Sequence, residues 1–399
     1  MEIQITNLDH QGRGIGRIND KIIFIPNTIP GEIVNAKITL EKKKYLEGSV
    51  IEIIKTAPER VSNLCPYYPK CWGCQLLHLP YENQLQYKEQ KIINIFNRYN
   101  LGNIKINSII GSSNNFNYRN KVTFQCHNNQ LGYYEDNSNN FINIKNCLLL
   151  NNKINEVIES LPLNKNKVVV RTNNNEVTFD NEKKIMHTIV DYKFLVSIDS
   201  FFQINDYVTP LLYCKVKDYL KNGEFNTVLD LYCGTGTIGI FISDVVKKVI
   251  GIEINQSAID DAIENSKLNN INNIEFICGD AGKESKKLKI KPDAVIIDPP
   301  RAGLNKEAIE TILNFNPQTI IYVSCDPMTL VRDLNILKEQ YDIIEVTPFD
   351  MFPNTYHVET ISLLKRKWGG FHEYFYKKYN RRWFTRSYWY SNSRLENSL

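Results

Sequence analysis

The chain has 399 residues, of which 42% are hydrophobic, and its formal net charge is +4. This length suits two to four domains with at least one sizeable core, and no run of roughly 18 apolar residues is present to span a membrane. Nine cysteines are an odd number in a chain too long for a small disulfide scaffold, and the N-terminus lacks a signal-peptide pattern. We therefore predict a cytoplasmic protein whose clustered cysteines bind a metal or react as thiols.

Residues 1–58 are predicted to form a small β-rich domain. The runs 22–25 and 33–38 have strand character and are separated by a Pro-Gly turn. Residues 12–17, with three glycines and two arginines, are predicted to be a flexible loop. Several short strands with such turns suit a small barrel, and barrels of this type often bind nucleic acid. A β-domain without any ligand is the alternative.

Three cysteines lie close together in the next segment, at Cys65, Cys71 and Cys74. A fourth ligand would have to come from elsewhere in the chain. Both zinc and iron–sulfur clusters accept four cysteines, and the spacing alone does not distinguish them. Unmetallated thiols are the remaining alternative.

Residues 81–99 have helical periodicity and are predicted to pack against the catalytic domain. Residues 100–190 are rich in asparagine, which is typical of turns and loops, and contain short strand-like runs. Beyond residue 195, four apolar strand-like runs alternate with helical segments, which predicts a doubly wound parallel sheet of the α/β class. Ligands bind at the carboxyl ends of the strands in such sheets. The four runs are 228–231, 248–253, 294–298 and 319–323.

The first of these runs ends in a glycine loop that opens a helix. Gly234 in this loop lets the backbone approach a ligand closely. Glu253 ends the next strand about 20 residues later, where a carboxylate can accept both ribose hydroxyls. Asp230 would repel phosphate, so the loop suits a cationic ligand better than a dinucleotide. The pattern resembles the first motif of class I S-adenosylmethionine (SAM)-dependent methyltransferases, which implies that Asp280 lies near the adenine. A plain strand–helix turn and an ordinary loop aspartate are the alternatives.

A reactive thiol is predicted at the end of the run 319–323. Asp326 can cap the following helix, with Pro327 at its first position. Cys325 would then lie beside a helix N-terminus, whose partial positive charge lowers the pKa of a thiol. A buried structural cysteine is the alternative.

A thiolate beside a SAM site suggests methylation of a pyrimidine at C5. Attack on C6 turns C5 into a carbon that can take a methyl group. A base must then remove the C5 proton, and Glu359 is the candidate. An exposed surface carboxylate is the alternative for Glu359, and a packing role is as reasonable for His357.

At this point the chain resembles the RNA uracil-5-methyltransferase family, over roughly residues 1–366. The resemblance implies that Cys325 is the nucleophile and Glu359 the base. It also implies that Gln203, Tyr232, Glu253 and Asp298 contact SAM, together with Gly234 and Asp280, although Gln203 and Asp298 are equally suited to orienting the uracil. It rests on five motifs in order, which are Phe201-Phe202-Gln203-Ile204-Asn205, Asp230-Leu231-Tyr232-Cys233-Gly234, Asp298-Pro299-Pro300-Arg301, Ser324-Cys325-Asp326-Pro327 and His357-Val358-Glu359-Thr360.

The same resemblance bears on the cysteines. Members of the family that act on rRNA carry a 4Fe-4S cluster. The resemblance therefore assigns such a cluster to four residues, which are Cys65, Cys71, Cys74 and Cys147. Cys126 is the alternative fourth ligand, but its surroundings in the sequence are more typical of a strand.

Three other segments take an interpretation from the resemblance. Residues 1–58 resemble a TRAM domain, an RNA-binding barrel. Arg119 and Lys121 lie in a stretch that matches the central domain, where they would contact phosphate or remain solvated charges. Residues 366–399 extend beyond the usual end of the family, with eight basic and two acidic residues and three of the four tryptophans. Such a segment could bind RNA by charge and stacking, or be an accessory extension.

We therefore predict an α/β protein in four parts. A TRAM-like barrel spans 1–58, a central iron–sulfur domain 59–194, a SAM-dependent methyltransferase domain 195–365 and a basic extension 366–399. The predicted reaction is methylation of uridine C5 in 23S rRNA. A tRNA is the alternative substrate, and a non-catalytic, metal-stabilised RNA-binding protein is the alternative from another class. We expect neither a membrane nor an obligate protein partner.

Overall fold

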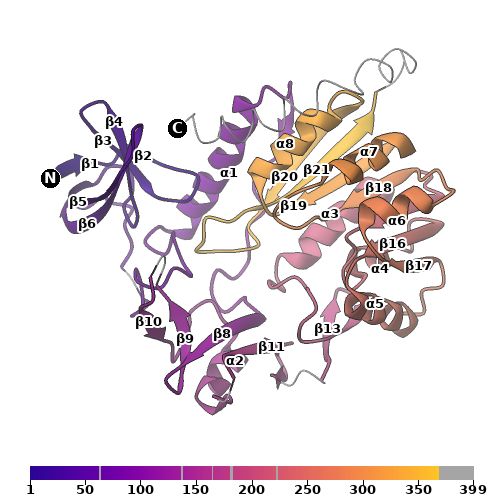
Figure 1. Cartoon of the computed structure of the whole chain (residues 1–399), viewed down its shortest axis with the longest axis horizontal. Coiled ribbons are helices and arrows are strands. Elements are labelled where there is room, and N and C mark those ends of the chain that lie inside the picture. The colour runs from indigo at the N-terminus through magenta and orange to yellow at the C-terminus, as the bar shows by residue number, and fades with distance from the viewer. Residues whose placement is uncertain (63, 136–137, 164, 180–182, 222, 368–399) are drawn as a thin grey trace. The chain divides into compact units, whose positions relative to one another are not determined.

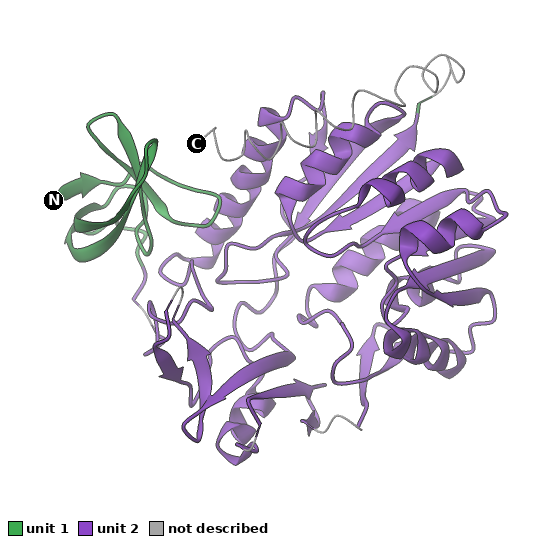
Figure 2. Ribbon diagram, in the orientation of Figure 1, with its two compact units in different colours: residues 1–60, 367–399 green, residues 61–366 purple. Residues whose placement is uncertain are grey.

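A computed structural model of the chain describes residues 1–367, except 63, 136–137, 164, 180–182 and 222. Residues 1–60 belong to one compact unit and residues 61–366 to another (Figure 2). The extension predicted at 366–399 lies outside the described residues from position 368 onward. Among the described residues, every helix is too short or too polar to cross a membrane.

The first unit is a six-stranded sheet in the order β1-β5-β6-β4-β3-β2 (Figure 1). Alternate residues of the strands point into one small core, which includes Ile3, Ile23, Val34 and Leu46. The strands are β1 (Glu2–Gln4), β2 (Asn7–Leu8), β3 (Gly14–Ile18), β4 (Lys21–Ile25), β5 (Ile33–Glu41) and β6 (Tyr45–Lys55).

The predicted flexible loop at 12–17 is wrong over most of its length, because residues from Gly14 onward form β3 and pair with β4. Its glycines allow close packing: a Cβ on Gly14 would lie 1.9 Å from Thr28 Oγ1. Arg13 is also not a free cation, since its guanidinium lies 2.8 Å from Asp9 and 3.2 Å from Glu47. Arg17 is exposed.

The second unit is built on an eight-stranded sheet in the order β17-β16-β15-β18-β19-β21-β20-β7 (Figure 1). The first five strands of this order are parallel, whereas β21 runs antiparallel between β19 and β20. The α/β class is thereby confirmed. The strands are β7 (Lys105–Ile106), β15 (Thr227–Leu231), β16 (Lys248–Glu253), β17 (Ile274–Cys278), β18 (Ala294–Ile297), β19 (Thr319–Ser324), β20 (Tyr341–Phe349) and β21 (Glu359–Arg366).

Helices cover both faces of this sheet. Successive residues of a strand point to opposite faces, and both sets of side chains are apolar here, so each face packs against helices. Val295 of β18 joins a core with α1, α6, α7 and α8, and its neighbour Ile296 joins a core with α3 and α4. The helices are α1 (Tyr81–Arg98), α3 (Thr209–Lys221), α4 (Thr237–Ile242), α5 (Gln256–Leu268), α6 (Ala281–Lys287), α7 (Lys306–Phe315) and α8 (Pro327–Leu337).

A smaller antiparallel sheet, in the order β10-β9-β8-β11-β12, lies between α1 and β15 in sequence and has its own core. The predicted division at residues 58, 194 and 365 stays a prediction. This part contains β8 (Lys121–His127), β9 (Gln130–Tyr134), β10 (Phe141–Asn143), α2 (Asn152–Val157), the short 3-10 helix Ile158–Ser160, β11 (Lys167–Thr172) and β12 (Val177–Thr178), followed by the hairpin of β13 (Ile185–Ile189) and β14 (Tyr192–Val196).

The predicted packing of the helix at 81–99 against the catalytic sheet is confirmed, since Ile92 and Phe96 of α1 share a core with α8. The same helix buries a charge. Lys88 Nζ lies 2.5 Å from Asp350 Oδ1, and both side chains are fully buried. Burial lowers the pKa of Lys88, and the Asp350 carboxylate opposes this effect.

We expect Asp350→Ala to lower the free energy of unfolding by about 3–5 kcal/mol, because it leaves the Lys88 ammonium buried without its partner. Urea unfolding of the two proteins measures the difference. Lys105→Ala is the matched control, since Lys105 is exposed where it meets Glu345, and such pairs contribute about 0–1 kcal/mol. Equal effects of the two substitutions would contradict the prediction.

Candidate active site

The turn between β15 and α4 has a backbone that leaves space for a ligand. Tyr232, Gly234 and Gly236 all have positive φ, at 65°, 54° and 76°. This region is open to glycine and disfavoured for tyrosine, so the turn is locally strained at Tyr232. A Cβ on Gly234 would meet no atom within 4 Å. The Gly234 amide donates to Glu253 Oε2 at 3.2 Å, which ties the turn to the end of β16.

Asp230 organises this turn from inside the sheet. Its side chain is fully buried, and Oδ2 accepts from the Gly239 amide at 3.1 Å. Burial and the nearby Asp298 carboxylate raise the pKa of Asp230 to about 8. Asp230 Oδ1 and Thr235 Oγ1 are buried with no hydrogen-bond partner among the described residues. Of these two residues, Thr235 lines the pocket beside the turn, whereas Asp230 does not.

Four of the residues predicted to contact SAM line one pocket beside this turn, which are Gln203, Tyr232, Gly234 and Asp298. The other two, Glu253 and Asp280, follow at the ends of neighbouring strands. Glu253 ends β16, and Asp280 follows β17 and caps α6 by accepting from the Lys283 amide at 3.0 Å. Burial raises the pKa of Tyr232 to about 12, and the carboxylates of Asp280 and Glu253 contribute. The six residues therefore gather at one edge of the sheet.

Cys325 and Glu359 are brought together by strand pairing. β19 and β21 are antiparallel, with Ser324 opposite Thr360, so the next residues in this register are Cys325 and Glu359. Glu359 is only 3% exposed. This burial excludes the alternative interpretation of Glu359 as an exposed surface carboxylate. Burial and the Asp298 carboxylate raise the pKa of Glu359, and Arg301 opposes this effect.

The predicted helix cap after Cys325 is confirmed. Asp326 precedes α8 and accepts from the amides of Met328 and Thr329 at 2.8 and 3.1 Å, with Pro327 at the first helical position. The predicted lowering of the Cys325 pKa is wrong in this arrangement. Burial, followed by the charges of Glu359 and Asp298, raises the pKa of the Cys325 thiol to about 12. Both effects oppose the influence of the helix N-terminus on the thiol.

Arg301 is the residue whose role in the site the sequence interpretation missed. Its guanidinium favours the charged forms of both Cys325 and Glu359. Arg301 Nη2 also lies 3.4 Å from His357 Nε2. Burial and Arg301 lower the pKa of His357 to about 3, so this ring is neutral at physiological pH. The sequence does contain one indication of this role. Arg301 comes directly after Asp298-Pro299-Pro300, at the end of a buried strand where ligands bind.

Comparisons with known proteins identify the family of this chain. Residues 163–367 match the family model described as tRNA (Uracil-5-)-methyltransferase, and residues 1–51 match the TRAM domain model. A protein of Clostridium acetobutylicum described as an uncharacterized RNA methyltransferase is 34% identical over 444 residues, which cover 92% of this chain and 96% of the relative. The chain belongs to the tRNA (uracil-5-)-methyltransferase family.

Two further similarities support this assignment of the methyltransferase. A Staphylococcus aureus protein with the same description is 33% identical over 440 residues, covering 91% of this chain and 97% of its own. The solved structure of the Pyrococcus abyssi tRNA (uracil-54, C5)-methyltransferase in complex with S-adenosyl-L-homocysteine has a TM-score of 0.72 and 25% identity, and covers 91% of this chain and 100% of that chain. The protein is a SAM-dependent RNA methyltransferase with an N-terminal TRAM domain.

The methyltransferase has a second cavity, of about 370 Å³, lined by four cysteines, which are Cys65, Cys71, Cys74 and Cys147. Cys126 lies on β8 and does not line it. Within the described ranges, no three His, Cys, Asp or Glu side chains converge closely enough to hold one metal ion. Arg119 lines the same cavity, and Lys121 donates to the Ser200 carbonyl at 3.1 Å. Both basic residues therefore lie against other parts of the chain, and neither is a freely solvated charge.

We expect the stability of the methyltransferase without added SAM to depend on pH through Asp298. Burial raises the pKa of Asp298 to about 7, against about 3.9 in the unfolded chain. The folded state therefore holds a proton that the unfolded state releases, and stability falls as the pH rises from about 4 to about 7. Asp298→Asn should raise the melting temperature by a few degrees at pH 8 and leave it unchanged at pH 4. Asp342→Asn, at an exposed carboxylate, is the control, and equal shifts at both pH values would contradict the prediction.

Proposed function

We propose that this enzyme methylates C5 of a uridine in 23S rRNA, with Cys325 as the nucleophile and Glu359 as the general base. One observation carries the proposal. Ser324 pairs with Thr360 at the ends of the antiparallel strands β19 and β21, and Cys325 and Glu359 are the next residues in this register. Asp298, at the end of the adjoining β18, lines the pocket of the glycine turn and also acts electrostatically on both residues. The thiol and the carboxylate thus adjoin the proposed SAM site.

The residues of the chain account for each chemical step. After the thiol of Cys325 and the carboxyl group of Glu359 have each lost a proton to solvent, the Cys325 sulfur adds to C6 of the uracil, and C5 gains nucleophilic character. C5 takes the methyl group from the sulfonium of SAM, which leaves as S-adenosylhomocysteine. Glu359 then removes the C5 proton, the C5–C6 double bond re-forms, and the Cys325 sulfur departs as thiolate. Arg301 favours the ionised forms of both residues during this sequence.

We also propose that Cys65, Cys71, Cys74 and Cys147 hold a 4Fe-4S cluster. Four thiols that line one cavity form the donor set of such a cluster. The choice of a cluster over a single zinc ion rests on the family resemblance, because four thiols by themselves suit both. The test is the iron and acid-labile sulfide content of anaerobically purified protein. Cys147→Ser should lower both, whereas Cys126→Ser should leave both unchanged, and the reverse result would reassign the fourth ligand.

The cysteines support 23S rRNA as the substrate, because the resemblance connects the cluster with family members that act on rRNA. The TRAM-like barrel at 1–58 and the cluster domain at 59–194 would bind that RNA, and residues 195–365 would carry the chemistry. A tRNA is the second candidate substrate. It is supported by the name of the matching family model and of the Pyrococcus abyssi enzyme.

The deciding experiment supplies methyl-labelled SAM and RNA from cells that lack the enzyme. The rRNA and the tRNA are separated after the reaction, digested to nucleosides, and analysed for the labelled nucleoside. Label in 5-methyluridine from 23S rRNA is the expected result. Label in tRNA would keep the chemistry and overturn the substrate. Absence of label from both, with RNA binding intact, would overturn the proposed reaction.

A further inference from the structure

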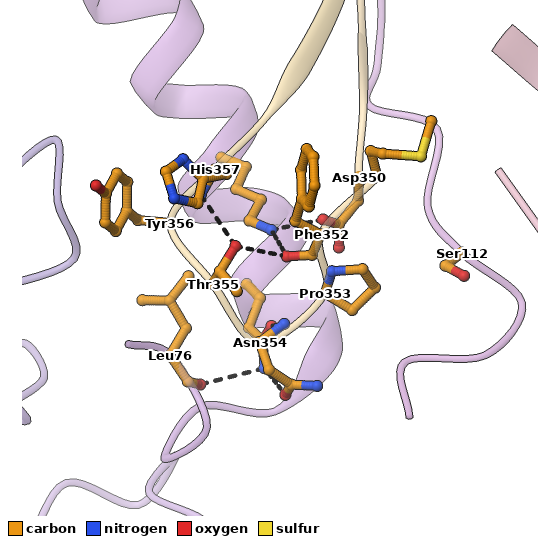
Figure 3. Close-up of polar contacts among 12 residues, drawn as sticks. Leu76, Ser112, Asp350, Phe352, Pro353, Asn354, Thr355, Tyr356 and His357 are labelled. Carbon is orange, nitrogen blue, oxygen red and sulfur yellow. Dashed lines mark hydrogen bonds and ion pairs between the residues drawn. The ribbon is translucent and has the colours of Figure 1, made fainter. Parts of the chain in front are cut away.

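The segment from Asp350 to His357 leads directly into Glu359, and its backbone is held by the segment that follows the cysteines (Figure 3). The Asn354 carbonyl accepts two hydrogen bonds, from the amides of Gln75 at 3.0 Å and Leu76 at 3.1 Å. Gln75 is the residue after Cys74, one of the four cysteines that line the second cavity. Asn354 therefore connects two segments that are far apart in sequence and belong to the two proposed sites.

Gln84 of α1 bridges the same two segments. Its side chain is 1% exposed. Its Nε2 donates to the carbonyls of Leu76 at 3.2 Å and Leu79 at 3.0 Å, and to Asn354 Oδ1 at 3.1 Å. Its Oε1 accepts from the Asn354 amide at 2.8 Å. The single amide of Gln84 thus contacts both the chain after Cys74 and the chain before Glu359.

Asn354 is held from further directions. Its φ of 66° lies in the left-handed region, which asparagine tolerates better than most residues. Its Nδ2 donates to the Asn115 carbonyl at 2.6 Å, and the Tyr118 hydroxyl donates to the neighbouring Pro353 carbonyl at 3.0 Å. These contacts give the turn at Asn354 a single defined position.

The remainder of the segment is bound to the same face of α1. Lys88 Nζ donates to the Phe352 carbonyl at 3.0 Å as well as to Asp350, and Lys91 Nζ donates to the Tyr356 carbonyl at 2.8 Å. Gln84, Lys88 and Lys91 recur at helical spacing, so one face of α1 holds the segment at successive points. Hydrogen bonds therefore connect Leu76, through Gln84 and Asn354, to the segment that leads into the strand beginning with Glu359.

We propose that Gln84 and Asn354 are positioning residues that couple the order of the cysteine segment to the placement of Glu359. The inference rests on the proposed roles of Glu359 and of the four cysteines. Hydrogen bonds between buried groups are directional, so they transmit a change of position that apolar contacts would absorb. Loss of the cysteine ligand set would then release the segment 350–357 and impair proton removal, while the SAM pocket at the other strand ends stays intact.

Hydrogen exchange followed by mass spectrometry tests the coupling on anaerobically purified, full-length protein. Cys74→Ser removes one cysteine of the set, and Gln84→Met removes the bridge while keeping the side-chain volume. Both should speed exchange in peptides covering 350–359 by about tenfold or more, because local opening sets the exchange rate. Peptides of β15 should exchange as in the wild type. Cys126→Ser and Gln90→Met are the controls, since Gln90 is exposed on the same helix.

Kinetics of Gln84→Met distinguish positioning from a general loss of structure. Its iron content and KM for SAM should match the wild type, and its kcat should fall by about tenfold to a hundredfold, as a displaced catalytic group predicts. Methylated RNA should also remain attached to the protein for longer, because the displaced base removes the C5 proton slowly.

Unchanged exchange at 350–359 in Cys74→Ser would overturn the coupling, as would a kcat for Gln84→Met equal to that of Gln90→Met. These outcomes are separate from failure of the proposed function. Exchange is read without any methyl transfer, whereas the proposed function fails only when wild-type protein labels no uridine.

Discussion

Cys325→Ala is expected to abolish methyl transfer, with kcat falling by about 10⁴-fold or more. Without the thiolate, nothing adds to C6, and C5 of the uracil remains too weak a nucleophile to take a methyl group. SAM binding should stay within about twofold of the wild type, because Cys325 does not line the pocket that contains Tyr232 and Asp298. Single-turnover transfer of labelled methyl to RNA, together with calorimetric titration of SAM, measures both quantities.

The matched control for this substitution is Cys214→Ala, which removes an exposed thiol on α3. It should leave both kcat and SAM binding unchanged. If Cys325→Ala kept more than about a tenth of the wild-type rate, covalent addition at C6 would be ruled out. The enzyme would then need another way to activate C5.

Glu359→Gln is expected to trap the reaction after methyl transfer. Glutamine has nearly the same shape but cannot accept the C5 proton, so the Cys325 sulfur cannot leave. Turnover should fall by about 10²–10⁴-fold, and a complex of protein with methyl-labelled RNA should accumulate and survive denaturing electrophoresis. Because Glu359 is buried with a raised pKa, the neutral glutamine should not lower the melting temperature.

The double variant Cys325→Ala/Glu359→Gln supplies the control, since it cannot form the bond to C6 and should show no such complex. Release of free methylated RNA by Glu359→Gln at the wild-type rate would assign proton removal to another group. Asp298 would be the next residue to test, because its carboxylate acts electrostatically on both Cys325 and Glu359.

Parts of the site were predictable because their signals are local in sequence. A glycine turn after a buried strand needs positive φ at Gly234, and Asp326 with Pro327 marks a helix start. Both depend on backbone conformations that a few neighbouring residues determine. The predicted flexible loop at 12–17 failed for a related reason: glycine also occurs where another segment packs too closely for a Cβ, as at Gly14 against Thr28. The sequence does not distinguish these two uses of glycine.

The pKa values of the site residues depend on residues that are distant in sequence. The pKa of Cys325 is raised because strand pairing places Glu359 next to it and the adjoining strand end adds Asp298. A prediction from the helix N-terminus alone has the wrong sign, because it leaves out burial and two carboxylates, which raise the pKa of the thiol. The role of Arg301 has the same origin, since its influence on Glu359 appears only when the ends of β18 and β21 come together.

By itself, the sequence determined the α/β class, the methyltransferase family, and the residue types of the proposed nucleophile and base. The class follows from strand periodicity, and the family and the two residues follow from short motifs that resemble those of a known family. Only the tertiary structure decided that the four cysteines share one cavity, that Gln84 joins their segment to the chain before Glu359, and that the Cys325 thiol is held protonated. Each of these depends on which segments become neighbours and on the burial of charge between them, and neither property exists until the chain is folded.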